Sequence, residues 1–339
     1  MTPSEWIKKI HSENYYREFP VEMFRKSCLI YKKNDYGIFL LEDMNGEKYT
    51  AKVLYYPAPL AGEVEISLYI KEVLELNKAV NGEIIPTFLL PEYIYVGKTP
   101  LDYPLFDQMK DNDISTACNP YDIKDIFFGG RGPIKDTYEK TKNRFKYVYY
   151  LTKACQYNLA QYFGVLKKTI SYQTFVKFAF EFLVGMQTLY SLGIWHKDIK
   201  SPNILVCVSS VSYVYLFPNG ERRFISSSPE DNKVVKIIDF GEAKIYDTAD
   251  RNNTPCKLFM DEINFSVISI LNLMWSKTVF SVSNNESKEN KNIAEVKYNN
   301  LISSLKSCDT DLIPVLLNSD IFKDLFAEPD IKYVPVQIL

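Results

Sequence analysis

The chain has 339 residues, with 40 Lys and Arg, 42 Asp and Glu and a formal net charge of −2. This balance gives no overall attraction to nucleic acid or to an anionic membrane, so neither is expected as a partner. Hydrophobic residues make up 46% and charged residues 24% of the chain, as in soluble globular proteins, and the length suits one two-lobed unit or two domains.

Cysteine and histidine usage bears on metal sites and on the cellular compartment. Six cysteines are scattered without a C-x-x-C pair, and there are only two histidines, so a zinc site is not expected. We expect free thiols in a reducing compartment. The first residues lack the apolar core of a signal peptide, and no run approaches the length of a membrane span. A cytoplasmic or nuclear address is therefore expected, with a virion-associated or secreted protein as the alternative.

The first half of the chain is predicted to be mainly β. Residues 4–25 have the pattern of an amphipathic helix. Strand patterns follow, and the dipeptide Asn45-Gly46 predicts a tight hairpin between the second and third strands. The predicted strands are Ser27–Tyr31, Ile38–Glu42, Lys48–Tyr55, Ile84–Gly97 and Phe145–Thr152. Residues 62–76 have helical spacing, and about 98–144 form an irregular insertion.

The second half is predicted to be mainly helical. Residues 172–192 are mostly apolar with a helical period and predict a buried core helix. A second insertion, about 208–232, contains a predicted hairpin, and the return strand Val234–Ile238 follows it. Residues 281–292 are polar without periodicity and predict a flexible loop. Further helices are expected at 261–271, 293–305, 311–317 and 321–326.

Two ordered motifs carry the chemistry. Residues 194–205 read Ile-Trp-His-Lys-Asp-Ile-Lys-Ser-Pro-Asn-Ile-Leu, and residues 236–241 read Lys-Ile-Ile-Asp-Phe-Gly. His-x-Asp with Lys two residues and Asn five residues after the Asp, followed by Asp-Phe-Gly, resembles the catalytic core of eukaryotic-type Ser/Thr protein kinases. The resemblance implies Mg²⁺ and ATP as cofactors and a protein Ser or Thr hydroxyl as the acceptor.

The resemblance assigns roles to four residues in these motifs. Asp198 is the catalytic base or hydroxyl positioner, and Lys200 steadies the γ-phosphate. Asn203 and Asp239 hold Mg²⁺. His196 is interpreted as a structural residue of the loop.

A phosphate-binding lysine is expected on the third strand. Thr50-Ala51-Lys52-Val53 is similar to the V-A-I-K strand of kinases, so Lys52 is expected on the α- and β-phosphates. Its carboxylate partner is expected on the next helix, where Glu65-Ile66-Ser67-Leu68 resembles the kinase pattern. Glu65 is the preferred partner, with Glu63 and Glu72 as rivals.

The nucleotide lid and the hinge complete the implied site. The G-x-G-x-x-G pattern falls on residues 32–37, where only the third glycine, Gly37, remains, preceded by Tyr36. Without the other glycines we expect a stiffer lid, with Lys32 and Lys33 as replacement charge. Residues 151–155 are the implied hinge to adenine, through Leu151, Thr152 and Ala154.

The implied fold is α+β and two-lobed, with a small antiparallel sheet and one helix in the N-lobe and a larger, mainly helical C-lobe. The boundaries are a helical extension at 1–26, an N-lobe at 27–153 and a C-lobe at 154–339. The segment after Asp239 is short and lacks Ala-Pro-Glu. We therefore expect activity without activation-loop phosphorylation. These departures are similar to those of divergent kinases of large DNA viruses, including the poxvirus type, or of intracellular parasites.

Two alternatives remain open. The poor phosphate loop is compatible with a non-catalytic binding module of kinase fold. A small-molecule phosphotransferase shares His-x-Asp and the metal Asn, but such enzymes generally lack Asp-Phe-Gly and Asp-x-Lys.

Overall fold

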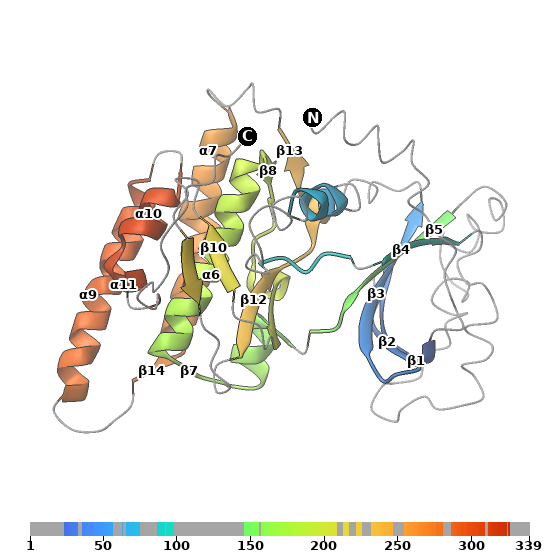
Figure 1. Cartoon of the computed structure of the whole chain (residues 1–339), viewed down its shortest axis with the longest axis horizontal. Helices are drawn as coiled ribbons and strands as arrows, with labels where there is room; N and C mark the ends of the chain where they lie inside the picture. Colours follow the sequence, from blue (N-terminus) through green and yellow to red (C-terminus); the bar gives the residue numbers. More distant parts are fainter. Residues whose placement is uncertain are drawn as a thin grey trace. The chain divides into compact units, whose positions relative to one another are not determined.

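The computed structural model divides the chain into two compact units (Figure 1). The first comprises residues 1–69 and 90–154, and the second comprises 70–89 and 155–339. The segment 70–89 thus groups with the second unit, although it falls inside the predicted N-lobe. The structure describes residues 24–32, 36–56, 63, 66–74, 87–91, 93–97, 146–155, 157–208, 213–216, 222–225, 232–246, 254–280, 286–308, 311–323 and 325. The insertion at about 98–144 lies outside them.

The first unit contains a five-stranded antiparallel sheet in the order β1-β2-β3-β5-β4. The prediction of five strands is confirmed, although β1 already begins at Phe24, inside the predicted helical extension, and the fourth strand is shorter than predicted. Residues 4–23 of that extension lie outside the described part of the chain. The strands are β1 (Phe24–Lys32), β2 (Tyr36–Asp43), β3 (Lys48–Tyr56), β4 (Tyr93–Gly97) and β5 (Lys146–Lys153).

The predicted hairpin joins β2 and β3. Gly46 has a positive φ of 85°, a conformation that glycine adopts without a steric penalty. The Asp43 carboxylate accepts the backbone N–H groups of Asn45 and Glu47, both at 2.8 Å. These bonds fix the register in which Lys52 of β3 lies opposite Ile38 of β2.

The second unit contains a three-stranded sheet in the order β12-β9-β6 and three two-stranded pairs. The predicted hairpin insertion is confirmed as β10 and β11, which pair antiparallel. The strands are β6 (Tyr157–Asn158), β7 (Ile170–Ser171), β8 (Ile194–Trp195), β9 (Ile204–Val208), β10 (Tyr213–Leu216), β11 (Arg222–Ile225), β12 (Lys233–Ile237), β13 (Lys244–Ile245) and β14 (Thr278–Val279).

The core of the second unit is built around α6 (Tyr172–Ser191). The Ser171 hydroxyl accepts the N–H of Thr174 and caps the first turn. Phe175, Phe178 and Phe180 are fully buried, so this helix is covered on most sides, as its apolar sequence predicts. Gly193, with φ of 69°, ends the helix and turns the chain into β8.

The other helices are the helix at residues 66–74, η2 (Gln161–Val165), η3 (Ser201–Asn203), η4 (Phe240–Glu242), α7 (Thr254–Glu262), η6 (Ile263–Val267), α8 (Ile268–Ser276), α9 (Glu286–Lys306), α10 (Ile313–Asn318) and α11 (Asp320–Lys323). Among them, α8, α10 and α11 pack against α6.

The prediction of a loop through residue 292 is wrong, because α9 begins at Glu286. Residues 289–292 of α9 are polar and exposed, and they carry no hydrophobic periodicity. Further along, Ala294, Tyr298 and Leu301 are buried at intervals of three and four residues. Packing of this later stripe stabilises a helix whose beginning has no apolar signal of its own.

Residues Lys257–Ser276 form a continuous helical stretch through α7, η6 and α8 that is long and apolar enough to cross a membrane. No such run was expected from the sequence. Ile263, Val267 and Leu271 in this stretch are fully buried within the unit. A core helix of a globular protein meets the same criteria, so length and composition give little support for a membrane span.

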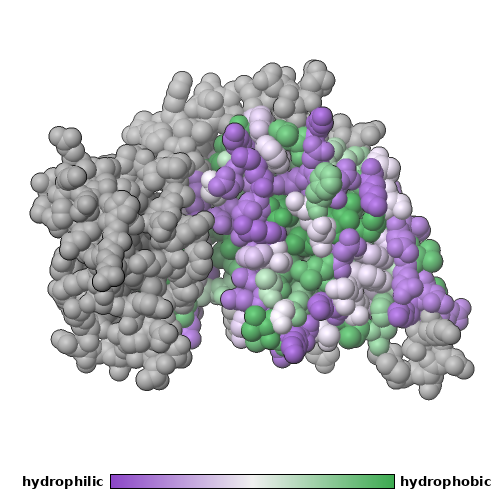
Figure 2. All heavy atoms as spheres, turned by 180° about the vertical axis from the view of Figure 1, so that it is seen from behind, coloured by the Kyte–Doolittle hydropathy of each residue, from purple (hydrophilic) through white to green (hydrophobic). Residues whose placement is uncertain are grey.

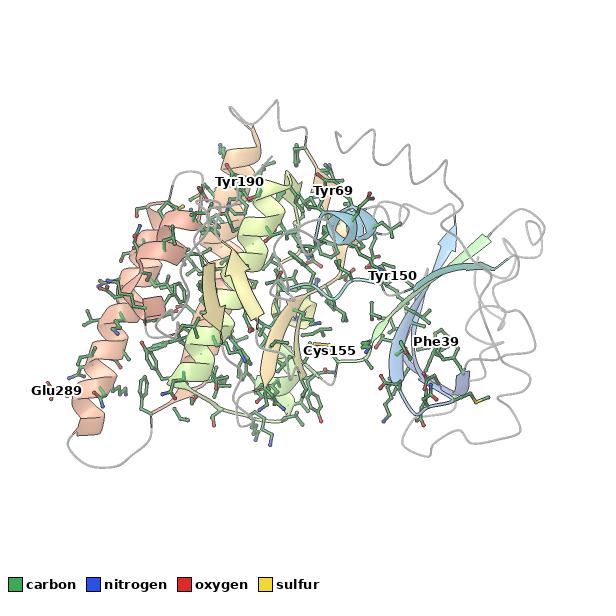
Figure 3. All side chains as sticks on the ribbon, viewed as in Figure 1. Phe39, Tyr69, Tyr150, Cys155, Tyr190 and Glu289 are labelled. Atoms are coloured by element: carbon green, nitrogen blue, oxygen red, sulfur yellow. A yellow bond between two sulfur atoms is a disulfide. The ribbon has the colours of Figure 1, made fainter. Side chains whose placement is uncertain are left out.

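The expectation that all cysteines are free thiols is wrong, because Cys155 and Cys207 form a disulfide (Figure 3). The two residues are 52 positions apart in sequence, and their Cα atoms are 4.9 Å apart. Sequence spacing gave no signal for this pair. Only the fold brings Cys155, two residues after β5, next to Cys207 of β9.

The surface seen in Figure 2 carries apolar and hydrophilic side chains intermixed over the described residues. Exposed large apolar residues such as Val165, Phe265 and Val296 come from different elements. Isolated exposed apolar side chains are normal on folded proteins.

Candidate active site

The first motif lies in the loop between β8 and β9 of the second unit. Asn203, at the end of η3, donates from its side-chain amide to both the backbone oxygen and the Oδ2 atom of Asp198, each at 2.9 Å. The Lys200 ammonium lies 2.6 Å from the same Oδ2. The structure therefore brings together three of the predicted residues: Asp198, Lys200 and Asn203.

His196 is a buried structural residue of this loop, as interpreted from the sequence. Its Nδ1 accepts the N–H of Asp198 at 3.3 Å, so its Nε2 carries the proton and donates to the oxygen of Ile238 at 3.0 Å. Desolvation lowers the pKa of His196, although the nearby charges of Asp239 and Asp198 oppose this shift. The neutral imidazole therefore links the first motif to the second.

Asp239 lies two residues after the end of β12. Its backbone is left-handed, with φ of 67°, and the preceding N–H of Ile238 donates to the oxygen of Asn203 at 3.0 Å. The next residue, Phe240, is buried against His196 and Phe88, with ring centroids 5.2 and 6.1 Å away. These contacts hold the second motif beside the first.

The donor set of Asn203 and Asp239 fits a magnesium ion. The hydrogen bonds to Asp198 engage the NH₂ group of Asn203, so its amide oxygen is the atom that can coordinate a metal. Mg²⁺ prefers oxygen ligands and is usually bound by one or two protein groups together with phosphate oxygens. The chemistry of the two predicted ligands is therefore suitable.

Glu262 supports the catalytic loop from the end of α7, and the sequence reasoning missed its contact. Its carboxylate accepts the N–H of Lys197 at 2.8 Å, and Lys197 has a positive φ of 68°. Burial raises the pKa of Glu262 to about 7, against the effect of its backbone hydrogen bonds to Lys197 and His196. The only signal in the sequence for this contact is that Glu262 is an acidic residue directly before the mostly apolar residues of η6 and α8.

In the first unit, Lys52 pairs with Glu63. Both carboxylate oxygens of Glu63 accept from the Lys52 ammonium, at 2.8 and 2.7 Å, and the Glu63 side chain is only 3% exposed. Glu63 was a rival in the sequence prediction, and the preferred Glu65 lies outside the described residues. Helical spacing alone could not choose between two carboxylates that are two positions apart.

The predicted lid and hinge residues lie in the sheet of the first unit. Tyr36 and Gly37 form the first residues of β2, opposite Leu54 and Val53, and residues 33–35 of the lid are outside the described part. In the hinge, Leu151 and Thr152 are buried.

Ala154 is the exception to the expected hinge arrangement. Its N–H donates to the oxygen of Lys48 at 2.9 Å. An adenine ring that used this N–H would have to displace the bond to Lys48.

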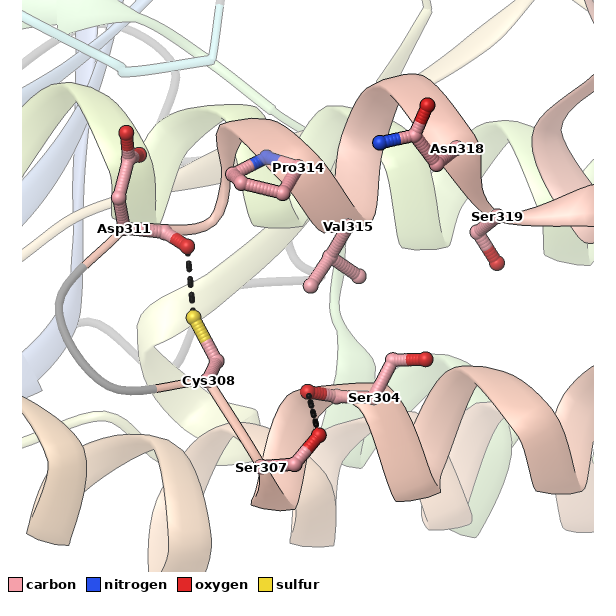
Figure 4. Close-up of a pocket in the computed structure, with 8 residues that line it drawn as sticks. All are labelled: Ser304, Ser307, Cys308, Asp311, Pro314, Val315, Asn318 and Ser319. Carbon is pink, nitrogen blue, oxygen red and sulfur yellow. Dashed lines mark hydrogen bonds between the residues drawn. The ribbon is translucent and has the colours of Figure 1, made fainter.

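A pocket of about 390 Å³ lies between the end of α9 and α10 (Figure 4). In its wall the Cys308 thiol donates to the backbone oxygen of Asp311. None of the residues predicted for phosphoryl transfer lines this pocket. Its lining residues are Ser304, Ser307, Cys308, Asp311, Pro314, Val315, Asn318 and Ser319.

Comparison with known families gives one match. The sequence model of the protein kinase domain matches residues 134–259, which include both motifs but less than half of the chain. This match supports a protein kinase. The mixed helices and small antiparallel sheets are compatible with a kinase-like fold, and a kinase domain generally uses ATP and Mg²⁺ and acts on proteins. No curated protein matches the chain.

Proposed function

We propose that this protein is a Ser/Thr protein kinase, a divergent member of its family, that transfers the γ-phosphate of Mg-ATP to protein hydroxyl groups. One observation carries the proposal: Asp198, Lys200 and Asn203 are hydrogen-bonded or ion-paired to one another, and backbone bonds place Asp239 beside them. An Asp, a Lys and two oxygen ligands in this order are the parts that phosphoryl transfer requires.

Each residue has a defined task in the proposed reaction. Asp198 orients the acceptor hydroxyl and takes its proton, and the ion-paired Lys200 remains close enough to steady the transferred phosphoryl group. Asn203 and Asp239 hold Mg²⁺, which neutralises charge on the phosphate oxygens when bound. Lys52, oriented by Glu63, binds the α- and β-phosphates. The Asp-x-Lys spacing of Asp198 and Lys200 is similar to Ser/Thr rather than Tyr kinases.

The proposal is tested by phosphate transfer from labelled ATP to a generic basic protein. We expect wild type to be active, and Asp198→Asn and Asp239→Ala to lose at least about 100-fold in rate, because each removes a group that acts in the transition state. Binding of Mg-ATP without any turnover would favour a non-catalytic scaffold. Turnover only on small alcohols would favour a small-molecule phosphotransferase.

The partner of Lys52 can be tested in the same assay. Glu63→Gln should lower the rate about 10-fold or more and raise the KM for ATP, since the variant loses the ion pair that orients Lys52. Glu65→Gln is the matched control and should leave both values near wild type. A large effect of Glu65→Gln alone would restore Glu65 as the partner.

We also propose that activity does not require phosphorylation of the short segment after Asp239. Lys197 replaces the Arg that reads a phosphorylated loop in many kinases, and its ammonium lies over the Trp195 ring at 5.4 Å. Treatment with a phosphatase should leave the rate unchanged, whatever the occupancy of Thr248 and Thr254. Loss of activity on dephosphorylation would contradict this.

A further inference from the structure

The outer edge of β12 has hydrogen-bond partners at three alternate residues, although β12 is the last strand of its sheet. Its inner edge bonds to β9. On the outer edge the backbone groups of three alternate residues find other partners. The Lys233 oxygen accepts from the Lys177 ammonium at 2.8 Å, and the Val235 N–H donates to Glu181 Oε2 at 3.0 Å. Ile237 exchanges bonds with Thr87 and Leu89.

Lys177 and Glu181 belong to one row of α6 that runs along β12. They are four residues apart, a rise of about 6 Å on a helix, and their partners on β12 are two residues apart, about 6.8 Å on a strand. The two repeats match closely enough for helix side chains to substitute for a missing strand. The next member of the row is Gly185, where an added Cβ would lie 2.8 Å from the Cδ1 atom of Ile237.

Both side chains of the row are deeply buried, with Lys177 3% and Glu181 1% exposed. Burying charged groups is costly unless they are paired and hydrogen-bonded. An apolar pair would fill the same space at lower cost but would remove the bonds to the Lys233 oxygen and the Val235 N–H. The two charged residues therefore fix where along α6 this strand lies.

The position of β12 matters because Asp239 follows two residues after its last residue. A shift of the strand along α6 would strain the bond from the Ile238 N–H to the Asn203 oxygen and would displace Asp239 from Asn203, whose loop is also held through Asp198 and Glu262. We propose that Lys177 and Glu181 are positioning residues that set the place of the metal ligand Asp239 by fixing β12. This inference rests on the proposed function, in which Asp239 holds Mg²⁺.

The test compares Glu181→Ala and Glu181→Gln with a matched control, Gln187→Ala. Gln187 is also a buried polar residue of α6, and its side-chain oxygen accepts the N–H of Leu312 at 2.8 Å, on a segment outside both motifs. Each variant is titrated with Mg²⁺ at fixed ATP. The midpoint is measured twice, from phosphate transfer and from the rise in Tm that Mg-ATP causes.

We expect Glu181→Ala to raise both Mg²⁺ midpoints about 10-fold or more, as residues that orient metal ligands do. Glu181→Gln retains an oxygen that accepts the Val235 N–H and should stay within about 3-fold of wild type. Gln187→Ala should lower Tm without moving either midpoint. Lys177→Met, which removes the bond to the Lys233 oxygen, should raise the midpoints by a smaller factor. This variant tests the inference if Glu181→Ala does not fold.

Two results would overturn the inference. If Glu181→Ala and Lys177→Met lower Tm but leave the Mg²⁺ midpoints of an active protein unchanged, the row is only structural and the proposed function stands. If wild type neither binds Mg-ATP nor transfers phosphate, the proposed function fails and this inference fails with it. The two failures are therefore distinguishable.

Discussion

Two non-glycine residues of the motifs, Lys197 and Asp239, have left-handed backbones, with φ of 68° and 67°. Such a conformation costs about 1–2 kcal/mol for a residue with a Cβ. At Lys197 the N–H is held by Glu262, which is itself buried. Before Asp239, both backbone groups of Ile238 are hydrogen-bonded. Contacts from residues distant in sequence thus maintain the backbone on which the chemistry depends.

Glu262 gives a pH-dependent prediction. Burial raises its pKa from 4.5 to about 7, so the folded protein retains a proton that the unfolded chain releases above about pH 4.5. The titration of Glu262 therefore lowers the free energy of unfolding by on the order of 3 kcal/mol as the pH rises from about 4.5 to 7. Above pH 7 the contribution of Glu262 no longer changes with pH. Glu262→Gln keeps an acceptor for Lys197 but cannot ionise, so it should remove this loss.

The measurement is urea unfolding of wild type and Glu262→Gln at steps from pH 5 to 8. The stability of the variant relative to wild type should increase with pH through this window. Glu289→Gln is the control, because Glu289 is an exposed residue of α9 (Figure 3). If the free energies of unfolding of wild type and Glu262→Gln changed in parallel with pH, Glu262 would titrate in the same pH range in the folded and unfolded protein. That result would contradict the prediction.

At the scale of elements, α6 joins the hydrophobic core to both motifs. It leads through Gly193 into the loop of Asp198, and it binds the strand that precedes Asp239. The sequence predicted its position and burial, because most residues from 172 to 192 are apolar with a helical period. Lys177 and Glu181 are the charged residues of that run, and their spacing at i and i+4 was the available signal for a specific role.

Replacement by alanine should have opposite effects on stability at Gly185, where α6 closely approaches β12, and at Gly164, which has open space around it. Gly185→Ala places a Cβ against Ile237 and 3.3 Å from the Cβ of Thr87. Overpacking costs about 1–3 kcal/mol and exceeds the helix-propensity gain of about 1 kcal/mol, so we expect a net loss of about 1 kcal/mol. At Gly164 nothing lies within 4 Å, so Gly164→Ala should be neutral or stabilising by up to about 1 kcal/mol.

Urea unfolding of both glycine variants measures this difference. If Gly185→Ala stabilised the protein as much as Gly164→Ala, the side chain of Ile237 would have moved without cost. The tight contact between α6 and β12 would then have no effect on stability.

At the scale of the whole molecule, the disulfide lies where the chain enters the second unit. Cys155 is the first residue after the division at Ala154, and its partner Cys207 lies on β9, the strand that follows Asn203. Closing a loop of this length restricts the unfolded chain and stabilises the folded one by about 4 kcal/mol in the chain-entropy description.

A reductant should therefore lower the Tm of wild type substantially. The double variant Cys155→Ala/Cys207→Ala should already have the lower Tm and should not respond to the reductant. Cys308→Ala, which changes a cysteine outside this pair, should behave as wild type. Peptide mapping without reduction should recover Cys155 and Cys207 in one linked fragment. Recovery of both as free thiols in the native protein would contradict the bond.

Features that depend on neighbours in sequence could be predicted without a structure. The strand register around Asn45-Gly46, the core helix at 172–191 and the group of Asp198, Lys200 and Asn203 each lie within one short stretch. Their geometry follows from turn chemistry, from hydrophobic periodicity and from a five-residue spacing. Asp239 could be assigned because a recognisable triplet marks it.

Pairings between distant segments were decided only by the tertiary structure. Helical spacing left Glu63 and Glu65 equivalent, and packing placed Glu63 on Lys52. Glu262 meets Lys197 across 65 residues, Cys155 meets Cys207 across 52, and Glu181 meets Val235 across 54. The preference of a short segment for helix or strand does not predict contacts with residues that are distant in sequence. They form because the folded chain leaves buried backbone groups and side chains that must find partners within reach.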